Sequence, residues 1–387
     1  MLKAAIALTA LPPLSLYIHF PWCERKCPYC DFNSHEKPDG IPESEYVDAL
    51  MRDLEQFLPW VWGRPLVSIF IGGGTPSLFS SASIARLISE IRARVKCLPG
   101  LEITLEANPG SFEADRFRGF ADAGVNRLSI GIQSFDNQQL KTLGRVHDRE
   151  QAIAAAALAV EIFPRVNIDL MFGLPSQSMA MLKADLEQAI NLGVGHISCY
   201  QLTMEPNTRF ALQPPPGLPD EELLADMQAF VVNRLKQSEF DRYEISAFCM
   251  PGHASQHNLN YWTFGDYLGI GAGAHGKISA AQRIVRTTRV RHPASYMESI
   301  GRTPINETEV SIEALPFEFM LNALRLVEGV PSHRWAQTTG IDVGAHPRLL
   351  DQIGVAQKAG LLSFTSGRFQ ATARGYELLN DLQSSFL

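Results

Sequence analysis

The sequence predicts an α/β fold, with a partial (β/α)6 barrel followed by a small, mainly helical, winged-helix-like domain at the C-terminus. Short β-rich runs alternate with amphipathic stretches over residues 16–202, and this alternation is typical of parallel βα units. A proline run at 214–219 ends the alternation, and helices followed by a hairpin come after it. The 387 residues are enough for two domains.

Six segments have the composition of the barrel strands. They are Leu16–Phe20, Val67–Ile71, Glu102–Glu106, Arg127–Gln133, Asn167–Phe172 and His196–Leu202. Apolar residues three to four apart predict helices between them, at Ser44–Leu58, Ser83–Val95, Phe112–Ala123, Arg149–Ile162 and Ser178–Asn191. Six strands close only part of a barrel, so we expect one side to be open to a large substrate.

The rest of the chain is expected to form a connector and a separate domain. A helix from about Asp220 to Leu235 begins a connector over residues 221–293, which completes the pocket of the barrel formed by residues 1–220. The C-terminal domain then covers residues 294–387. Its predicted elements are helices at Glu313–Val327, Ser332–Thr339 and Pro347–Ala359, a hairpin at Leu361–Thr372 and a closing helix.

Composition excludes several classes of protein. The formal charge is −7, from 34 basic and 41 acidic residues, so we expect no nucleic acid partner. No apolar run approaches the roughly 18 residues of a membrane span, so any membrane association is expected to be peripheral. A signal peptide over residues 1–16 is disfavoured by Pro12 and Pro13. The six cysteines do not form a secreted disulfide pattern, so we expect a reducing cytoplasm.

Three cysteines lie close together on the loop after the first predicted strand, at Cys23, Cys27 and Cys30. Thiolates are the usual ligands of iron–sulfur clusters, and a [4Fe–4S] cluster normally takes four of them. Because no fourth cysteine follows in this segment, we expect a cluster with one iron open to an outside ligand. The amino and carboxylate groups of S-adenosylmethionine can fill that position. A structural zinc site with His19 or His35 is the alternative.

This cysteine motif resembles that of the radical S-adenosylmethionine proteins, in particular the coproporphyrinogen III dehydrogenase-like group. The resemblance extends from Tyr17 through the C-terminal domain. It implies a radical-SAM barrel that carries a [4Fe–4S] cluster and S-adenosylmethionine. In this family, an electron from the cluster cleaves S-adenosylmethionine to methionine and a 5′-deoxyadenosyl radical. The resemblance therefore also implies a low-potential electron donor, which the sequence does not identify.

The resemblance also implies which residues contact S-adenosylmethionine. The glycine-rich turn would bind the methionine amino group, Arg145 would pair with the methionine carboxylate, and carboxylates and amides would bind the ribose hydroxyls. The full set is Tyr17, Tyr29, Gly73, Gly74, Thr75, Glu106, Gln133, Arg145, Asp169, Thr203 and His275. Residues 271–276 match GxGxxG, but no helix and no acidic residue follow as in a dinucleotide site, so we interpret them as a loop that closes the pocket.

The segment from His257 to Trp262 matches the HNxxYW motif of the heme-chaperone branch of this group. The oxidase branch commonly has a further cysteine two residues after the third, where this chain has Phe32. The resemblance therefore implies heme as a bound cargo that is delivered to apo-hemoproteins. An imidazole can ligate heme iron and aromatic faces can pack on the macrocycle, so the heme candidates are His257, Tyr261 and Trp262.

Two alternatives remain open at this point. The three heme candidates could simply pack and form hydrogen bonds inside the barrel. The protein could also be an oxygen-independent coproporphyrinogen III oxidase, in which the adenosyl radical abstracts hydrogen from propionate side chains before decarboxylation. A basic run, Arg283, Arg286, Arg289 and Arg291, is interpreted either as a solvated face or as partners for heme propionates.

Overall fold

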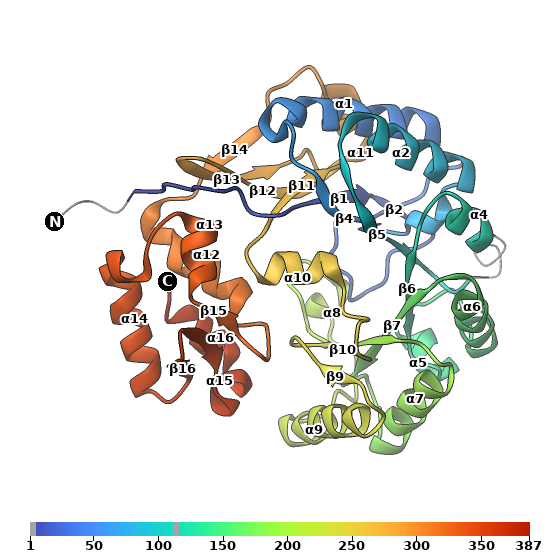
Figure 1. Cartoon of the computed structure of the whole chain (residues 1–387). Coiled ribbons are helices and arrows are strands. Elements are labelled where there is room, and N and C mark those ends of the chain that lie inside the picture. The colour runs from blue at the N-terminus through green and yellow to red at the C-terminus, as the bar shows by residue number, and fades with distance from the viewer. Residues whose placement is uncertain (1–4, 111–115) are drawn as a thin grey trace.

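The computed structural model describes residues 5–110 and 116–387, and its centre is a twelve-stranded sheet that curves into an open barrel (Figure 1). Six strands in sequence order form the middle of this sheet, and all are parallel to their neighbours within that group. They are β1 (Leu14–Phe20), β4 (Leu66–Gly73), β5 (Cys97–Ala107), β6 (Arg127–Gln133), β7 (Arg165–Phe172) and β8 (His196–Gln201). The predicted barrel strands are confirmed.

Helices cover the outside of these strands, as parallel βα units require (Figure 1). The long ones are α1 (Glu43–Val61), α2 (Ser81–Arg94), α6 (Arg149–Ile162), α7 (Met179–Asn191) and α9 (Glu221–Gln237). Shorter helical segments in this part of the chain are η1 (Pro76–Leu78), α4 (Phe117–Asp122), α5 (Asn137–Thr142) and α8 (Arg209–Leu212), the last of which contacts the cysteine loop. Ser80, Asp148 and Ser178 cap α2, α6 and α7 through their side chains. The start of the helix expected over Phe112–Ala123 lies outside the described residues.

The sheet extends at both edges beyond the six predicted strands. β11 (Asp266–Ile270) pairs in parallel with β1, and β12 (His275–Ala280), β13 (Arg283–Thr288) and β14 (Asn306–Glu309) follow in antiparallel order. At the other edge, β10 (Ala247–Cys249) and β9 (Asp241–Arg242) lie beyond β8. Strands from residues 221–293, predicted as a connector, therefore form part of the barrel sheet itself.

The basic run begins on β13, and three of its four arginines have carboxylate partners. Arg283 pairs with Glu307 in an exposed pair. Arg289 is buried and pairs with Asp53, while Arg286 pairs with Glu318. The solvated-face interpretation is therefore wrong for Arg289. The Arg286 and Arg289 guanidinium groups are both used in holding the fold together.

The C-terminal unit has a hydrophobic core of its own, built around Phe319, Trp335 and Phe369. Ile6, near the N-terminus, is buried in the same core. After α10 (Gln256–Trp262) and α11 (Pro293–Ser299), the elements are η2 (Ile312–Ala314), α12 (Leu315–Ala323), β15 (Val330–Pro331), α13 (His333–Thr339), η3 (Val343–Ala345), α14 (Pro347–Lys358), β16 (Leu362–Thr365), β17 (Arg368–Ala371), α15 (Ala373–Glu377) and α16 (Leu379–Ser384). The expected helices and hairpin are confirmed.

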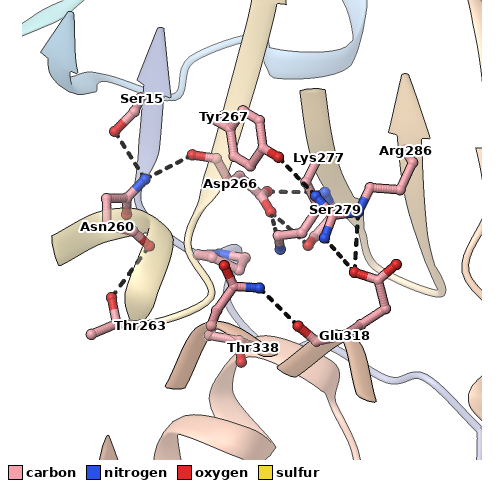
Figure 2. A network of polar contacts seen from close by, with 12 residues as sticks. Ser15, Asn260, Thr263, Asp266, Tyr267, Lys277, Ser279, Arg286, Glu318 and Thr338 are labelled. Carbon is pink, nitrogen blue, oxygen red and sulfur yellow. Dashed lines mark hydrogen bonds and ion pairs between the residues drawn. The ribbon is translucent and has the colours of Figure 1, made fainter. Parts of the chain in front are cut away.

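A buried ion pair holds the added strands in register beside β1 (Figure 2). The Asp266 carboxylate accepts from Lys277 Nζ at 2.9 Å and from Arg64 Nη2 at 2.7 Å. It also accepts from the backbone and the hydroxyl of Ser279, at 2.9 and 2.8 Å. Burial opposes ionisation, but Lys277 and Arg64 lower the pKa of Asp266 below its usual range. Because this site is buried, water cannot solvate an unpaired charge, so the carboxylate depends on these partners.

Replacing Asp266 with Ala should destabilise the protein by about 3 kcal/mol or more, because Lys277 would remain buried without its counter-charge. The matched control is Glu307→Ala, which removes the partner of Arg283 in an exposed pair and should cost less than about 1 kcal/mol. Urea denaturation of both variants checks this. Equal losses for the two would show that the buried pair has no special role.

Candidate functional site

A pocket opens at the carboxyl ends of the parallel strands, and the three clustered cysteines line it. This is the rim where βα barrels bind their ligands. Nine of the eleven residues predicted to contact S-adenosylmethionine line the same pocket. They are Tyr29, Gly73, Gly74, Thr75, Glu106, Gln133, Arg145, Asp169 and Thr203. The other two, Tyr17 and His275, do not line it: Tyr17 lies within β1 and His275 is an exposed residue at the start of β12.

The cysteine loop is held by backbone pairing at its start and its end. Cys23 lies in β2 (Trp22–Cys23), which pairs in parallel with β3 (His35–Glu36). Between these two strands, a turn brings Cys30 N to Cys27 O at 3.2 Å. The two ends of the loop are therefore held side by side, and its three cysteines line the pocket.

The thiols lie close enough to affect one another's ionisation. Burial raises the pKa of Cys23 to about 11, and its two neighbouring thiols add to this effect. Burial also raises the pKa of Cys30. Thiolate ligands in such a place require a strongly positive centre, and the irons of a cluster provide one.

The zinc alternative fits this arrangement poorly. Zinc holds sulfur at about 2.3 Å, so its ligands must converge tightly. Within residues 5–110 and 116–387, no three His, Cys, Asp or Glu side chains converge closely enough for a single ion. His19 is also engaged, since its ring nitrogens bond to the Tyr17 hydroxyl and to Asn33 O, each at 2.9 Å. Three thiols that line one pocket suit a multi-iron cluster, in which each cysteine holds a different iron.

The turn after β4 approaches the cysteine loop so closely that only glycine fits. A Cβ on Gly74 would lie 2.4 Å from Trp22 O, and one on Gly73 would lie 2.5 Å from the His19 ring. Gly73 also has a φ of +118°, which side chains disfavour. Its amide donates to Glu106 Oε2 at 2.9 Å. The amides of this turn donate hydrogen bonds within the chain. The ammonium group of a ligand is itself a donor, so the carbonyl oxygens are the groups of this turn that could bind it.

Two partly buried carboxyl groups, Glu106 on β5 and Asp169 on β7, line the pocket on either side of β6. Burial raises the pKa of Glu106 to about 8, and the charge of Asp169 adds to the shift. Burial also raises the pKa of Asp169, whose oxygens accept from Asn167 Nδ2 at 2.8 Å and from the Ser129 hydroxyl at 3.4 Å. A carboxyl group that is neutral near pH 7 can donate as well as accept, which suits the hydroxyl groups of a ribose.

Gln133 has a strained backbone at the end of β6. Its φ is +72°, and the pairing with β7 shifts register between Gly131 and Gln133. The Tyr200 hydroxyl donates to Gln133 Oε1 at 3.0 Å, which orients the amide. The turn that follows is fixed by Asp185, which accepts from the Phe135 amide and the Ser134 hydroxyl, both at 2.7 Å. Strain of this kind persists where the surroundings impose it, and it is commonly found at ligand sites.

Arg145 is the cation that faces the cysteines. Its guanidinium donates to Asn108 Oδ1 at 2.6 Å, to Gly131 O at 2.5 Å and to Cys27 Sγ at 3.7 Å. Burial works against its charge, but Tyr29 and Cys27 raise the pKa of Arg145 above its usual value. Its buried Nε has no partner among the described residues. The guanidinium can therefore donate a further hydrogen bond to an anionic ligand.

Several pocket residues were missing from the predicted set. They include Asn108, Ser129, Gly131 and Tyr200. A signal for two of them was present, because Ser129, Gly131 and Gln133 are two residues apart on β6 and therefore face the same side. Asn108 also lies just after a predicted strand, at the rim where βα barrels bind ligands, but its partners Thr75 and Arg145 come from distant segments. Tyr200 gave no such signal, because its bond to Gln133 also joins distant segments.

The structure brings the heme candidates together, but away from this pocket. His257 is buried, and its two ring nitrogens are hydrogen-bonded to the Ser68 hydroxyl and the Tyr261 hydroxyl, each at 2.9 Å. Trp262 lies under the Arg325 guanidinium of the C-terminal unit, 4.1 Å from the ring centre. Helix α10, which contains all three candidates, thus lies between the barrel strands and the C-terminal helices (Figure 1). In this conformation neither imidazole nitrogen is free to ligate iron.

Comparison with known proteins agrees with both the fold and the site. The model of the Radical SAM superfamily matches residues 17–189, and that of the HemN C-terminal domain matches residues 310–378. A heme chaperone HemW of Escherichia coli K12 is 46% identical over 382 residues, covering 98% of this chain and 100% of the relative. The chain belongs to the HemW family of radical SAM proteins. The predicted resemblance to the coproporphyrinogen III dehydrogenase-like group is confirmed.

Other relatives extend the HemW comparison. The heme chaperone HemW of Bacillus subtilis is 35% identical over 379 residues, covering 96% of this chain and 99% of the relative. The solved structure of E. coli coproporphyrinogen III oxidase, HemN, has a TM-score of 0.81 at 23% identity, over 97% of this chain and 90% of that one. That likeness shows the fold. Radical SAM membership implies a [4Fe–4S] cluster and S-adenosylmethionine. In the described residues, no helix is both long and apolar enough to cross a membrane.

The buried imidazole of His257 should make the protein sensitive to acid. Burial, aided by the Arg127 charge, lowers the pKa of His257 to about 3, against about 6.5 in an unfolded chain. Between about pH 6.5 and pH 3, His257 is therefore protonated in the unfolded chain but neutral in the folded one. The free energy of unfolding falls as the pH decreases through this range. Between pH 7 and pH 5, wild type should lose about 2 kcal/mol more stability than His257→Gln does.

Urea denaturation at both pH values, on preparations of equal iron content, measures this difference. The control variant is His333→Gln, which replaces an exposed histidine on α13. If the stabilities of wild type and His257→Gln fell in parallel, the imidazole would not be buried in its neutral form.

Proposed function

We propose that this protein is a heme chaperone that binds heme and transfers it to apo-hemoproteins, with respiratory-chain proteins as acceptors. The observation that carries the proposal is its similarity, over nearly its whole length, to relatives named heme chaperone HemW. The alternative, an oxygen-independent coproporphyrinogen III oxidase, is supported only at the level of fold. Phe32, at the position where oxidases commonly have a further cysteine, also disfavours it.

We propose that Cys23, Cys27 and Cys30 hold the [4Fe–4S] cluster. The support is that all three line one pocket and lie within the part of the chain that matches the Radical SAM superfamily. When bound beside S-adenosylmethionine, the cluster would supply one-electron chemistry, and a low-potential donor would have to reduce it. In this proposal Arg145 pairs with the methionine carboxylate, carbonyl oxygens of the glycine turn bind the amino group, and Glu106 orients the ribose.

The remaining assignments follow from the same proposal. Gln133 and Asp169 would complete the contacts to the adenosine part, and Tyr29 and Thr203 would lie at the edge of the pocket, which they line. Tyr17 would act at most indirectly, through its hydrogen bond to His19. His275 would reach the ligand only after a change of conformation, because it does not line the pocket. We propose a cytoplasmic location, peripheral membrane contact at most, and no nucleic acid partner.

For heme itself, we propose the segment His257 to Trp262 as the binding element, with His257 as the candidate axial ligand. Ligation through Nε2 requires the imidazole to exchange its bond to Tyr261 for one to iron. Since α10 is buried between the barrel and the C-terminal unit, it must also move outward. The proposal therefore includes a local opening of this helix.

One anaerobic experiment separates the chaperone from the oxidase. The reconstituted protein is given coproporphyrinogen III, S-adenosylmethionine and a reductant, while heme binding is titrated in a parallel sample. We expect heme to bind with about one per chain and no protoporphyrinogen to form. Decarboxylated product on every turnover would defeat the chaperone proposal, whereas cleavage of S-adenosylmethionine alone would not.

The heme-ligand role of His257 is tested by His257→Ala. We expect loss of the Soret band of the heme complex and a heme stoichiometry well below that of wild type. The matched control is Tyr261→Phe, which keeps an aromatic face but releases Nε2, and it should bind heme at least as tightly as wild type. An unchanged Soret band in His257→Ala would assign His257 a purely structural role.

A further inference from the structure

Asn108 connects the glycine turn to the arginine that faces the cysteines. It follows β5 directly and lines the pocket. Its Nδ2 donates to Thr75 Oγ1 at 3.0 Å, and its Oδ1 accepts from Arg145 Nη2 at 2.6 Å. Its backbone amide donates to Ser77 Oγ at 3.4 Å. One amide side chain thus joins segments that follow three different strands.

The chemistry of its partners fixes the orientation of this amide. A guanidinium can only donate hydrogen bonds, so the atom of Asn108 that faces Arg145 must be the oxygen. The amide nitrogen then faces the Thr75 hydroxyl, which can accept. Both ends of the side chain are used, and the side chain cannot turn over without losing both bonds.

Asn108 holds Arg145 without cancelling its charge. The partners of the guanidinium among the described residues are the Asn108 amide oxygen, the Gly131 carbonyl and the Cys27 thiol. None of these is a carboxylate. The buried Nε of Arg145 has no partner in that part of the chain. An aspartate at position 108 would supply a carboxylate at the same distance and would pair with Arg145 within the chain.

We propose that Asn108 is a positioning residue that aims an uncompensated Arg145 charge at an anionic group of the ligand in this pocket. The inference rests on the proposed function, in which that group is the carboxylate of S-adenosylmethionine. The proposal requires an uncharged side chain at position 108, because a charged one would pair with Arg145 and weaken the preference for ligands that have a carboxylate. Asn108 itself needs no contact with the ligand.

The test compares Asn108→Asp with wild type, both reconstituted anaerobically and checked for iron and sulfide per chain. Dissociation constants are measured for S-adenosylmethionine, S-adenosylhomocysteine and 5′-methylthioadenosine, the last of which keeps the adenosine but lacks the carboxylate. Asn108→Asp should weaken binding of the first two by about tenfold or more. Binding of 5′-methylthioadenosine should stay within about twofold of wild type, because this ligand is uncharged and has no carboxylate for Arg145 to bind.

The chain offers a matched control in Asn126, which directly precedes β6 and is hydrogen-bonded to β5. Asn126 accepts from Ile103 N and donates to Leu101 O, each at 2.8 Å, and does not line the pocket. Asn126→Asp makes the same chemical change there and should leave all three dissociation constants unchanged. If Asn108→Asp does not retain iron, Asn108→Ser replaces it, with the same selective loss expected because the bridge to Arg145 is removed.

The outcomes are distinguishable. Wild-type protein that has its cluster but does not bind S-adenosylmethionine would overturn the proposed cofactor site, whatever the variants do. Wild-type binding that Asn108→Asp leaves unchanged would overturn only the positioning role. An equal loss for all three ligands would also overturn it, because it would indicate a general distortion of the pocket. Selective loss of the carboxylate-bearing ligands supports it.

Discussion

The site depends on the backbone pairing between the chain that leaves β1 and the turn that follows β4. Gly74 N donates to Phe20 O at 2.6 Å, and Thr75 N donates to Trp22 O at 2.7 Å. Only glycine at positions 73 and 74 permits this approach. Because Cys23 follows Trp22 directly, the pairing sets where the cysteine loop begins relative to the glycine turn. The two parts of the pocket are therefore one rigid unit, and the rest of the site is arranged around it.

A second set of contacts ties the far side of the pocket to the same unit. Arg145 follows α5 in the chain, yet it contacts Cys27 on the cysteine loop and Asn108 after β5. Gly131 on β6 completes the ring through its carbonyl. These contacts join groups from four segments, each of which follows or ends a parallel strand. The barrel supplies the strand ends, and the polar contacts between them give the pocket its chemistry.

The sequence predicts the six central strands and the cysteines well, and there are physical reasons for this. Parallel strands are covered on both faces, so they appear as nearly continuous apolar runs. The added strands β11 and β12 lack such runs, because their buried positions include Asp266 and Lys277, which are tolerated only as a pair. The buried Arg289, directly after β13, is likewise paired with Asp53. The proline run and the helix after it suggested a connector here, whereas the structure places strands with buried, paired charges in this segment.

In the site, too, some residues could be predicted from the sequence and others could not. Residues assigned from the family resemblance, such as Glu106 and Gln133, lie in the pocket, whereas the role of Asn108 was not predicted because it depends on Arg145. Such a contact is set by the barrel closing on itself, and no local pattern encodes it.

The HNxxYW segment is the proposed heme-binding element, but its side chains also hold α10 in place between the barrel and the C-terminal unit. Heme binding would therefore have to break some of these contacts. If His257 ligates heme, the exchange gives up its bond to Tyr261, at a net cost of about 1 kcal/mol. Outward movement of α10 also separates Trp262 from Arg325, which costs up to about 2 kcal/mol more. Openings of a few kcal/mol lie within the range of local unfolding in folded proteins. Arg325 also pairs with Glu244, so heme entry at this helix would be coupled to the docking of the C-terminal unit on the barrel.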